Sequence, residues 1–101
     1  MTWATVERLA VERLRAELRR ASVRPRLPEA AWPAWAAFWE LNDTRAWTER
    51  GPAAVDHAAM QAFYSLKGEP PHAPTVRLIR ALDRAYCLHM TEEIARRVAQ
   101  R

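Results

Sequence analysis

The spacing of apolar residues along this chain predicts helices throughout. Alternating runs of apolar and polar residues, the pattern of a half-buried strand, are missing, and alanine, leucine, arginine and glutamate dominate. Both glycines and most prolines fall between the helical segments, where they would end one helix and begin the next. The sequence therefore predicts an all-α fold, a small bundle of three core helices preceded by an N-terminal amphipathic helix.

The first predicted helix runs from about Trp3 to Ala21 and carries a narrow apolar stripe between charged flanks. Because the stripe is thin, we expect this helix to pack across the core or against a second copy of the chain. A proline-punctuated, extended linker follows. The chain would divide into this helix with its linker, residues 1–26, and a helical core domain, residues 27–101. The stripe consists of Trp3, Val6, Ala10, Val11, Leu14 and Leu18.

Tryptophan is concentrated in the second predicted helix, which begins near residue 28 and ends near residue 41. Trp32, Trp35 and Trp39 share one helical face, and each could bury about 150–250 Å². A domain of 101 residues needs large side chains inside, so we assign these three tryptophans to the core. If they were solvent-exposed in an isolated monomer, the cluster would instead be a binding site.

The third predicted helix runs from Pro52 to Lys67 and ends at Gly68, a residue suited to a left-handed cap. A turn at residues 42–44 and a short segment at residues 45–49 precede it. Two of its faces carry apolar residues. The face assigned to the core consists of Val55, Ala59, Ala62, Phe63 and Leu66. The other face consists of His57, Met60 and Tyr64 and is predicted to bind a partner, as is the first helix through Trp3, Val6 and Leu14.

The last predicted helix begins at residue 74 or 75 and extends to residue 99, with its arginine-rich end projecting beyond the core or fraying. Its apolar stripe includes Leu82 and Tyr86, both assigned to the core, and it also contains Asp83. A buried carboxylate needs donors, so we expect Asp83 to accept from a tryptophan indole, a helix N-terminus or an arginine such as Arg80. The alternative is that Asp83 anchors a partner.

The charge is basic but unevenly distributed. The net charge is +4, and all but one of the 16 basic residues are arginine, a bias that a GC-rich genome would also produce. Both ends of the chain are basic and the middle is mildly acidic. A single cysteine, Cys87, excludes an internal disulfide, and neither a signal peptide nor a membrane-length apolar run is present. These features favour a cytoplasmic protein.

The sequence offers no constellation for catalysis, metal binding or a cofactor. The three histidines are far apart, and no cysteine–histidine pair has zinc spacing. Cys87 and His89 lie two positions apart, so on a helix they point in different directions. Only two glycines are present, which excludes a glycine-rich phosphate loop. We therefore expect a protein that is not an enzyme.

Nucleic-acid binding is an alternative because arginines share helix faces at both ends of the chain. Arg8, Arg15 and Arg19 lie on one face of the first helix, and Arg77 and Arg84 lie on one face of the last. Glutamates interleave with the N-terminal arginines, however, and no glycine-containing tight turn joins two short helices as in a helix-turn-helix. Nucleic acid is therefore the less favoured partner.

Two motifs resemble those of a known group of proteins. Residues 32–41 read Trp-Pro-x-Trp-x-x-Phe-Trp-Glu-Leu, and residues 77–86 read Arg-Leu-Ile-Arg-Ala-Leu-Asp-x-Ala-Tyr, with a Gly-Pro break at residues 51–52 between them. This pattern resembles small helical tail assembly chaperones, or related uncharacterised tail-module proteins, of long-tailed bacteriophages and prophages. The resemblance covers roughly residues 27–90 and leaves out the first helix.

The resemblance implies a role without catalysis in the cytoplasm of a bacterial host. Such chaperones keep the long, aggregation-prone tape measure protein soluble, recruit tail tube subunits and leave before the virion is complete. A helix-in-groove contact with an adaptable apolar surface would suit this task. Two other functions stay open, a small basic regulator that binds DNA or RNA and a structural tail or head-tail component that remains in the particle.

Overall fold

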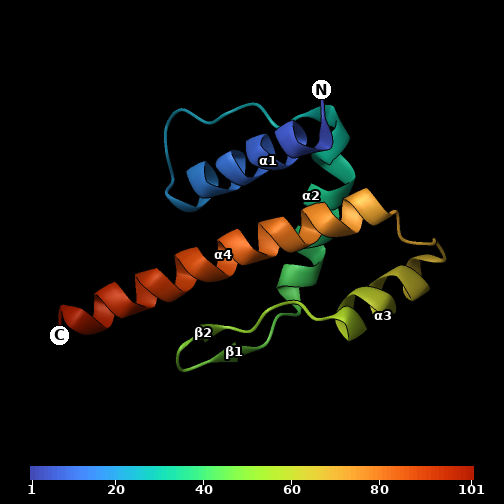
Figure 1. The fold of residues 1–101 in the computed structure, drawn as a ribbon. Helices are drawn as coiled ribbons and strands as arrows, with labels where there is room; N and C mark the ends of the chain where they lie inside the picture. Colours follow the sequence, from blue (N-terminus) through green and yellow to red (C-terminus); the bar gives the residue numbers. More distant parts are fainter.

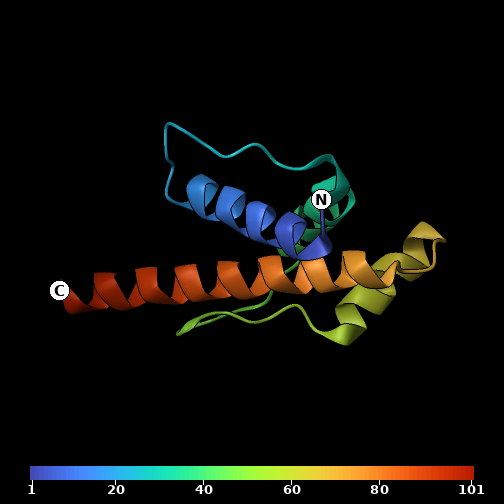
Figure 2. The ribbon, with the colours of Figure 1, turned by 45° about the horizontal axis from the view of Figure 1, so that its top comes forward.

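The computed structural model describes all 101 residues and is mainly helical. The long helices α1 and α4 start at the same end of the molecule, α2 runs across α4, and α3 packs near the start of α4 (Figure 1). A two-stranded hairpin lies on the side of α4 opposite α1 (Figure 2). The elements are α1 (Trp3–Leu18), a 3-10 turn η1 (Glu29–Ala31), α2 (Trp32–Asp43), β1 (Trp47–Thr48), β2 (Gly51–Pro52), α3 (His57–Lys67) and α4 (Ala73–Ala99).

The expectation that the chain has no strands was wrong at residues 47–52. Trp47 pairs with Pro52 and Thr48 with Gly51, in antiparallel register. The Thr48 hydroxyl closes the turn, since it donates to the Gly51 carbonyl at 3.0 Å and accepts from the Arg50 amide at 3.2 Å. Strands of two residues are too short to show an alternating pattern, so the pattern could not predict them.

The core is built on α1, α2 and α4, and not on the three helices after the linker. Leu14 of α1, Phe38 of α2 and Leu82 of α4 are among the largest fully buried side chains. α3 contributes one buried residue, Met60, and lies at the edge. The prediction of a mainly helical fold is therefore confirmed, but the prediction of which three helices form the core was wrong. The thin stripe on α1 is nevertheless buried, because Val6, Ala10 and Leu14 all lie in the core where α1 packs on α4.

The assignment of the tryptophan face of α2 to the core was wrong for Trp32, which is 52% exposed. Trp35 and Trp39 are partly buried and pack along the flank of the core. The buried face lies on a different side of the helix from these tryptophans and combines small alanines with Phe38 and Leu41. Small residues at this face let α2 cross α4 closely, so the bulky indoles are placed beside the contact.

The prediction of which face of α3 is buried was also wrong. Met60 is buried and Tyr64 partly buried on the face predicted to be free, whereas Ala59, Ala62 and Leu66 of the predicted core face are exposed. Phe63 packs partly against the core. The helix begins at His57, five residues later than predicted, because the hairpin occupies residues 51–52 and the Asp56 carboxylate caps the helix by accepting from the Ala59 amide at 2.8 Å.

Two expectations about helix ends are confirmed. Gly68 ends α3 in the left-handed conformation, with φ of 70°. The last turns of α4 extend beyond both α1 and the hairpin (Figures 1 and 2). None of the helices has the length and apolarity that crossing a membrane requires.

Gly51 lies where the hairpin packs on α4. We expect Gly51→Ala to destabilise the protein more than Gly68→Ala. Gly51 has φ of 138°, and an added Cβ would lie 3.0 Å from the Thr91 hydroxyl oxygen. Gly68 also has a positive φ, but an added Cβ would meet nothing within 4 Å. Backbone strain alone costs about 1–2 kcal/mol in both variants. Thermal melts should therefore place G51A below G68A, and the reverse order would contradict the close packing at Thr91.

Candidate protein-binding groove

The helices α1 and α4 diverge toward the C-terminal end of α1 (Figures 1 and 2). A groove lies between them there. It has a volume of about 1100 Å³ and is walled by α1, α4 and the residues that follow α1. We call it the α1–α4 groove. Its apolar lining residues are Leu18, Trp39, Ala85, Tyr86, Leu88 and Met90. Its charged and titratable lining residues are Arg15, Glu17, Arg19, Arg20, His89, Glu92, Glu93, Arg96 and Arg97.

Aromatic rings connect the lining of the groove to the core. The ring centroids of Trp39 and Phe38 are 5.2 Å apart, and those of Phe38 and Tyr86 are 5.8 Å apart. Both pairs meet edge to face. Phe38 is fully buried, whereas Trp39 is only partly buried. This arrangement holds Trp39 beside the groove, so its exposed part offers apolar contact area with little entropy left to lose on binding, whereas Tyr86 is buried.

The groove has a surplus of positive charge. Glu17 already pairs with Arg13 at 2.9 Å and with Arg24 at 3.1 Å, and neither arginine lines the groove. Glu93 pairs with Arg96. The lining arginines that form no ion pair are Arg15, Arg19, Arg20 and Arg97. Among the lining carboxylates, only Glu92 is left without an ion-pair partner.

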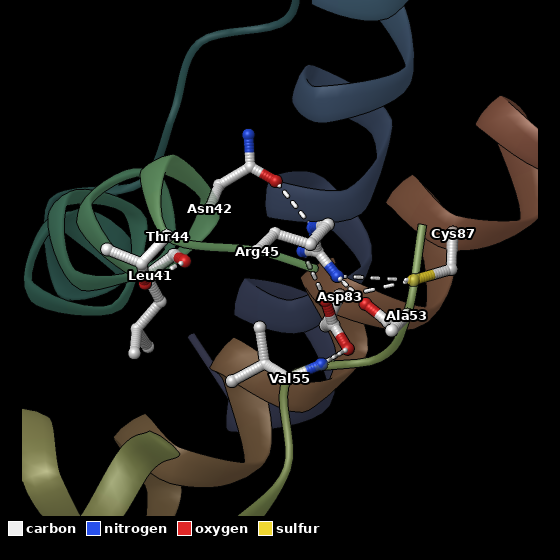
Figure 3. A network of polar contacts seen from close by, with 8 residues as sticks. All are labelled: Leu41, Asn42, Thr44, Arg45, Ala53, Val55, Asp83 and Cys87. Carbon is white, nitrogen blue, oxygen red and sulfur yellow. Dashed lines mark hydrogen bonds and ion pairs between the residues drawn. The ribbon is translucent and has the colours of Figure 1, made fainter. Parts of the chain in front are cut away.

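A buried ion pair fastens the hairpin segment to α4 on another side of the core (Figure 3). The Arg45 guanidinium lies 2.5 Å from the Asp83 carboxylate, and the two side chains are 1% and 7% exposed. The other Asp83 oxygen accepts from the Val55 amide at 3.0 Å. Arg45 also donates to the Ala53 carbonyl at 2.6 Å and stacks over the Tyr86 ring at 4.7 Å.

This network gives Asp83 the donors that the sequence required, although the arginine is Arg45 rather than Arg80. Arg80 instead lies 3.1 Å from the His57 ring nitrogen. Asn42 completes the network by accepting from the Arg45 Nε at 2.8 Å. Every donor to Asp83 comes from the chain itself, so this carboxylate is occupied within the fold and holds residues 45–55 on α4.

Cys87 borders the same network, 3.4 Å from the Arg45 guanidinium and 3.9 Å from the Asp83 carboxylate. Burial raises the pKa of the thiol, and the negative charge of Asp83 raises it further, against the opposing effect of Arg45. We expect Cys87 to be alkylated by iodoacetamide more slowly at pH 8 in the folded protein than in urea. The Cys87 thiol of the unfolded chain ionises at its ordinary pKa of about 8.5, below the pKa of the same thiol in the folded protein. The free energy of unfolding therefore falls as the pH rises above about 8.5. Equal alkylation rates in both states would contradict the raised pKa.

The residues predicted to bind a partner do not form one surface. His57, Met60 and Tyr64 do line one groove, of about 540 Å³, between α3 and the start of α4. Within this groove Met60 is buried. Burial raises the pKa of the Tyr64 hydroxyl, and the negative charge of Glu69 raises it further.

The other three residues predicted to bind a partner lie on α1. Val6 and Leu14 are buried in the core, so the prediction that they bind a partner was wrong. Their stripe packs on α4 within the same chain. Trp3 lies apart, 42% exposed, with its ring 6.1 Å from that of His72.

The sequence did not point to the residues of the α1–α4 groove as a site. Leu88 lies outside the main apolar stripe of α4 and is 55% exposed. Its exposure, which marks it as a candidate contact residue, is visible only in the folded structure. Arg45 lies in the short segment, residues 45–49, that the sequence predicts after a turn, and nothing distinguishes it there from the other arginines. No group of three or more histidine, cysteine, aspartate or glutamate side chains is placed to hold a metal ion.

Comparison with known proteins identifies no relative. No family model matches the chain, and neither a curated protein nor a solved structure is detectably similar to it.

Proposed function

We propose that this chain is a protein-binding tail assembly chaperone of a long-tailed bacteriophage or prophage and has no catalytic role. In this proposal it acts in the bacterial cytoplasm and holds a helical segment of the tape measure protein, or a tail tube subunit, in the α1–α4 groove. The proposal combines the resemblance of residues 32–41 and 77–86 to such proteins with the apolar lining of the groove.

The observation that carries the proposal is where the two motifs meet. The first motif supplies Trp39 and Phe38, the second supplies Tyr86, and the Phe38 and Tyr86 rings lie 5.8 Å apart. Trp39 and Tyr86 then line the same groove. The segments that carry the resemblance therefore build both the core contact and part of an accessible apolar surface, which is what a helix-in-groove binder needs.

The test is co-expression of the chain with a tape measure protein and, separately, with a tail tube protein. We expect the tape measure protein to become more soluble and to be recovered with this chain in a pull-down. If no complex forms with either protein and solubility does not rise, the proposal fails. Mass spectrometry of purified virions separates a departing chaperone from a component that stays in the particle, because only the latter is found there.

A further inference from the structure

The shape of the α1–α4 groove suits a single helix. Its lining residues on α4 run from Ala85 to Arg97, which at 1.5 Å per residue corresponds to about 18 Å of groove, or about three helical turns. The opposite wall is the end of α1, from Arg15 to Leu18, together with Arg19 and Arg20. The apolar lining residues of α4 end at Met90, so a helix laid between these two walls would contact apolar side chains over the first part of this length and charged side chains beyond it.

The groove also carries the charge that decides which helix fits. Arg15, Arg19 and Arg20 on one wall and Arg97 on the other have no ion-pair partner within the chain. On the α4 wall the unpaired Glu92 offsets Arg97, so the surplus of unneutralised arginine lies on the α1 wall. A partner helix would therefore meet this positive charge on the flank that faces α1. Opposite charges across such an interface set partner choice and speed association.

We propose that the α1–α4 groove binds an amphipathic partner helix that carries aspartate and glutamate along the flank of its apolar face that lies against α1. This inference rests on the proposed function, which it makes more specific. The terminal helices of a second copy fit less well, because residues 1–26 and 76–101 are both basic and would repel the arginines of the groove. Nucleic acid would match the arginines but leave Leu18, Leu88 and Met90 without apolar contacts.

The experiment uses the full chain and three designed peptides of about 15 residues with one common apolar face. Their flanking positions carry glutamate, glutamine or lysine, and binding is followed by the change in tryptophan fluorescence. At low salt we expect the glutamate peptide to bind about tenfold more tightly than the glutamine peptide, and the lysine peptide most weakly. The advantage of the glutamate peptide should shrink at about 0.5 M salt, because salt screens exposed charges.

Variants locate the effect within the groove. The double variant Arg15→Gln and Arg19→Gln should lose most of the preference for the glutamate peptide. The matched control is Arg50→Gln with Arg77→Gln, which removes two exposed arginines that form no ion pair and lie outside the groove, and it should keep the preference.

Each failure has its own meaning. Equal binding of the glutamate and glutamine peptides would overturn the charge preference and leave the proposed function standing. If none of the three peptides binds, while the tape measure protein is still captured on co-expression, the groove is not the binding site and the inference fails alone. If capture is also absent, both fail. Tighter binding of a short DNA duplex than of the glutamate peptide would likewise overturn the inference, in favour of a nucleic-acid partner.

Discussion

Asp83→Ala is expected to lower the free energy of unfolding by about 3–5 kcal/mol, because it leaves the buried Arg45 guanidinium without its counter-charge. The variant also removes the acceptor of the Val55 amide, so the segment after the hairpin loses its attachment to α4. A domain of this size is stabilised by only about 5–15 kcal/mol in total. The melting temperature should fall by more than about 12 °C, measured by circular dichroism.

A matched control separates the buried pair from an ordinary surface pair. Glu40 and Lys67 form an ion pair at 3.3 Å with both side chains well exposed, so Glu40→Ala should change stability by less than about 1 kcal/mol. Combining Asp83→Leu with Arg45→Met should recover much of the loss, because neither charge then remains buried. An Asp83→Ala variant that melts within a few degrees of the original protein would show that the network does not stabilise the fold.

Leu88→Asp is the second variant with a large expected effect, and it acts on binding rather than on stability. Leu88 lines the α1–α4 groove and is 55% exposed, so aspartate should be tolerated by the fold. In the groove the new carboxylate would face the apolar side of a bound helix and would have to be desolvated there. We expect the captured amount of tape measure protein to fall at least about tenfold, which corresponds to about 1.4 kcal/mol.

Leu66→Asp is the matched control, since Leu66 is 90% exposed on α3 and lines none of the grooves described above. It makes the same chemical change and should leave both capture and melting temperature unchanged. If L66D abolished capture while L88D did not, the partner surface would lie on the exposed face of α3. That result would reject the α1–α4 groove as the binding site while keeping a protein partner.

The helices were predictable because their signals are local. Apolar spacing placed α1, α2 and α4 along the chain, and Gly68 marked the end of α3. Asp83 was recognisable as a buried acid from its position within an apolar stripe. The hairpin was not predictable by these means, since its strands have two residues each and β2 packs on α4, which is distant in the sequence.

The candidate site was less predictable than the fold. Its apolar lining residues come from α1, α2 and α4, and the one that is more than half exposed on α4, Leu88, lies outside the main apolar stripe. The tryptophans misled the assignment because a bulky apolar residue is equally suited to a core and to an exposed surface. Trp32 and Trp39 belong to one face by sequence, yet Trp32 is half-exposed and Trp39 packs against Phe38.

Local signals in the sequence were enough to place the helices along the chain, to mark the end of α3 at Gly68 and to single out one carboxylate that needs donors, because these properties depend on neighbours along the chain. Which face of each helix is buried depends instead on how the helices pack against one another. The fold buries Ala10, Ala34 and Met60 and leaves Trp32 about half exposed. The same packing selected Arg45 among fifteen arginines as the partner of Asp83, and it left the α1–α4 groove open where the two helices diverge.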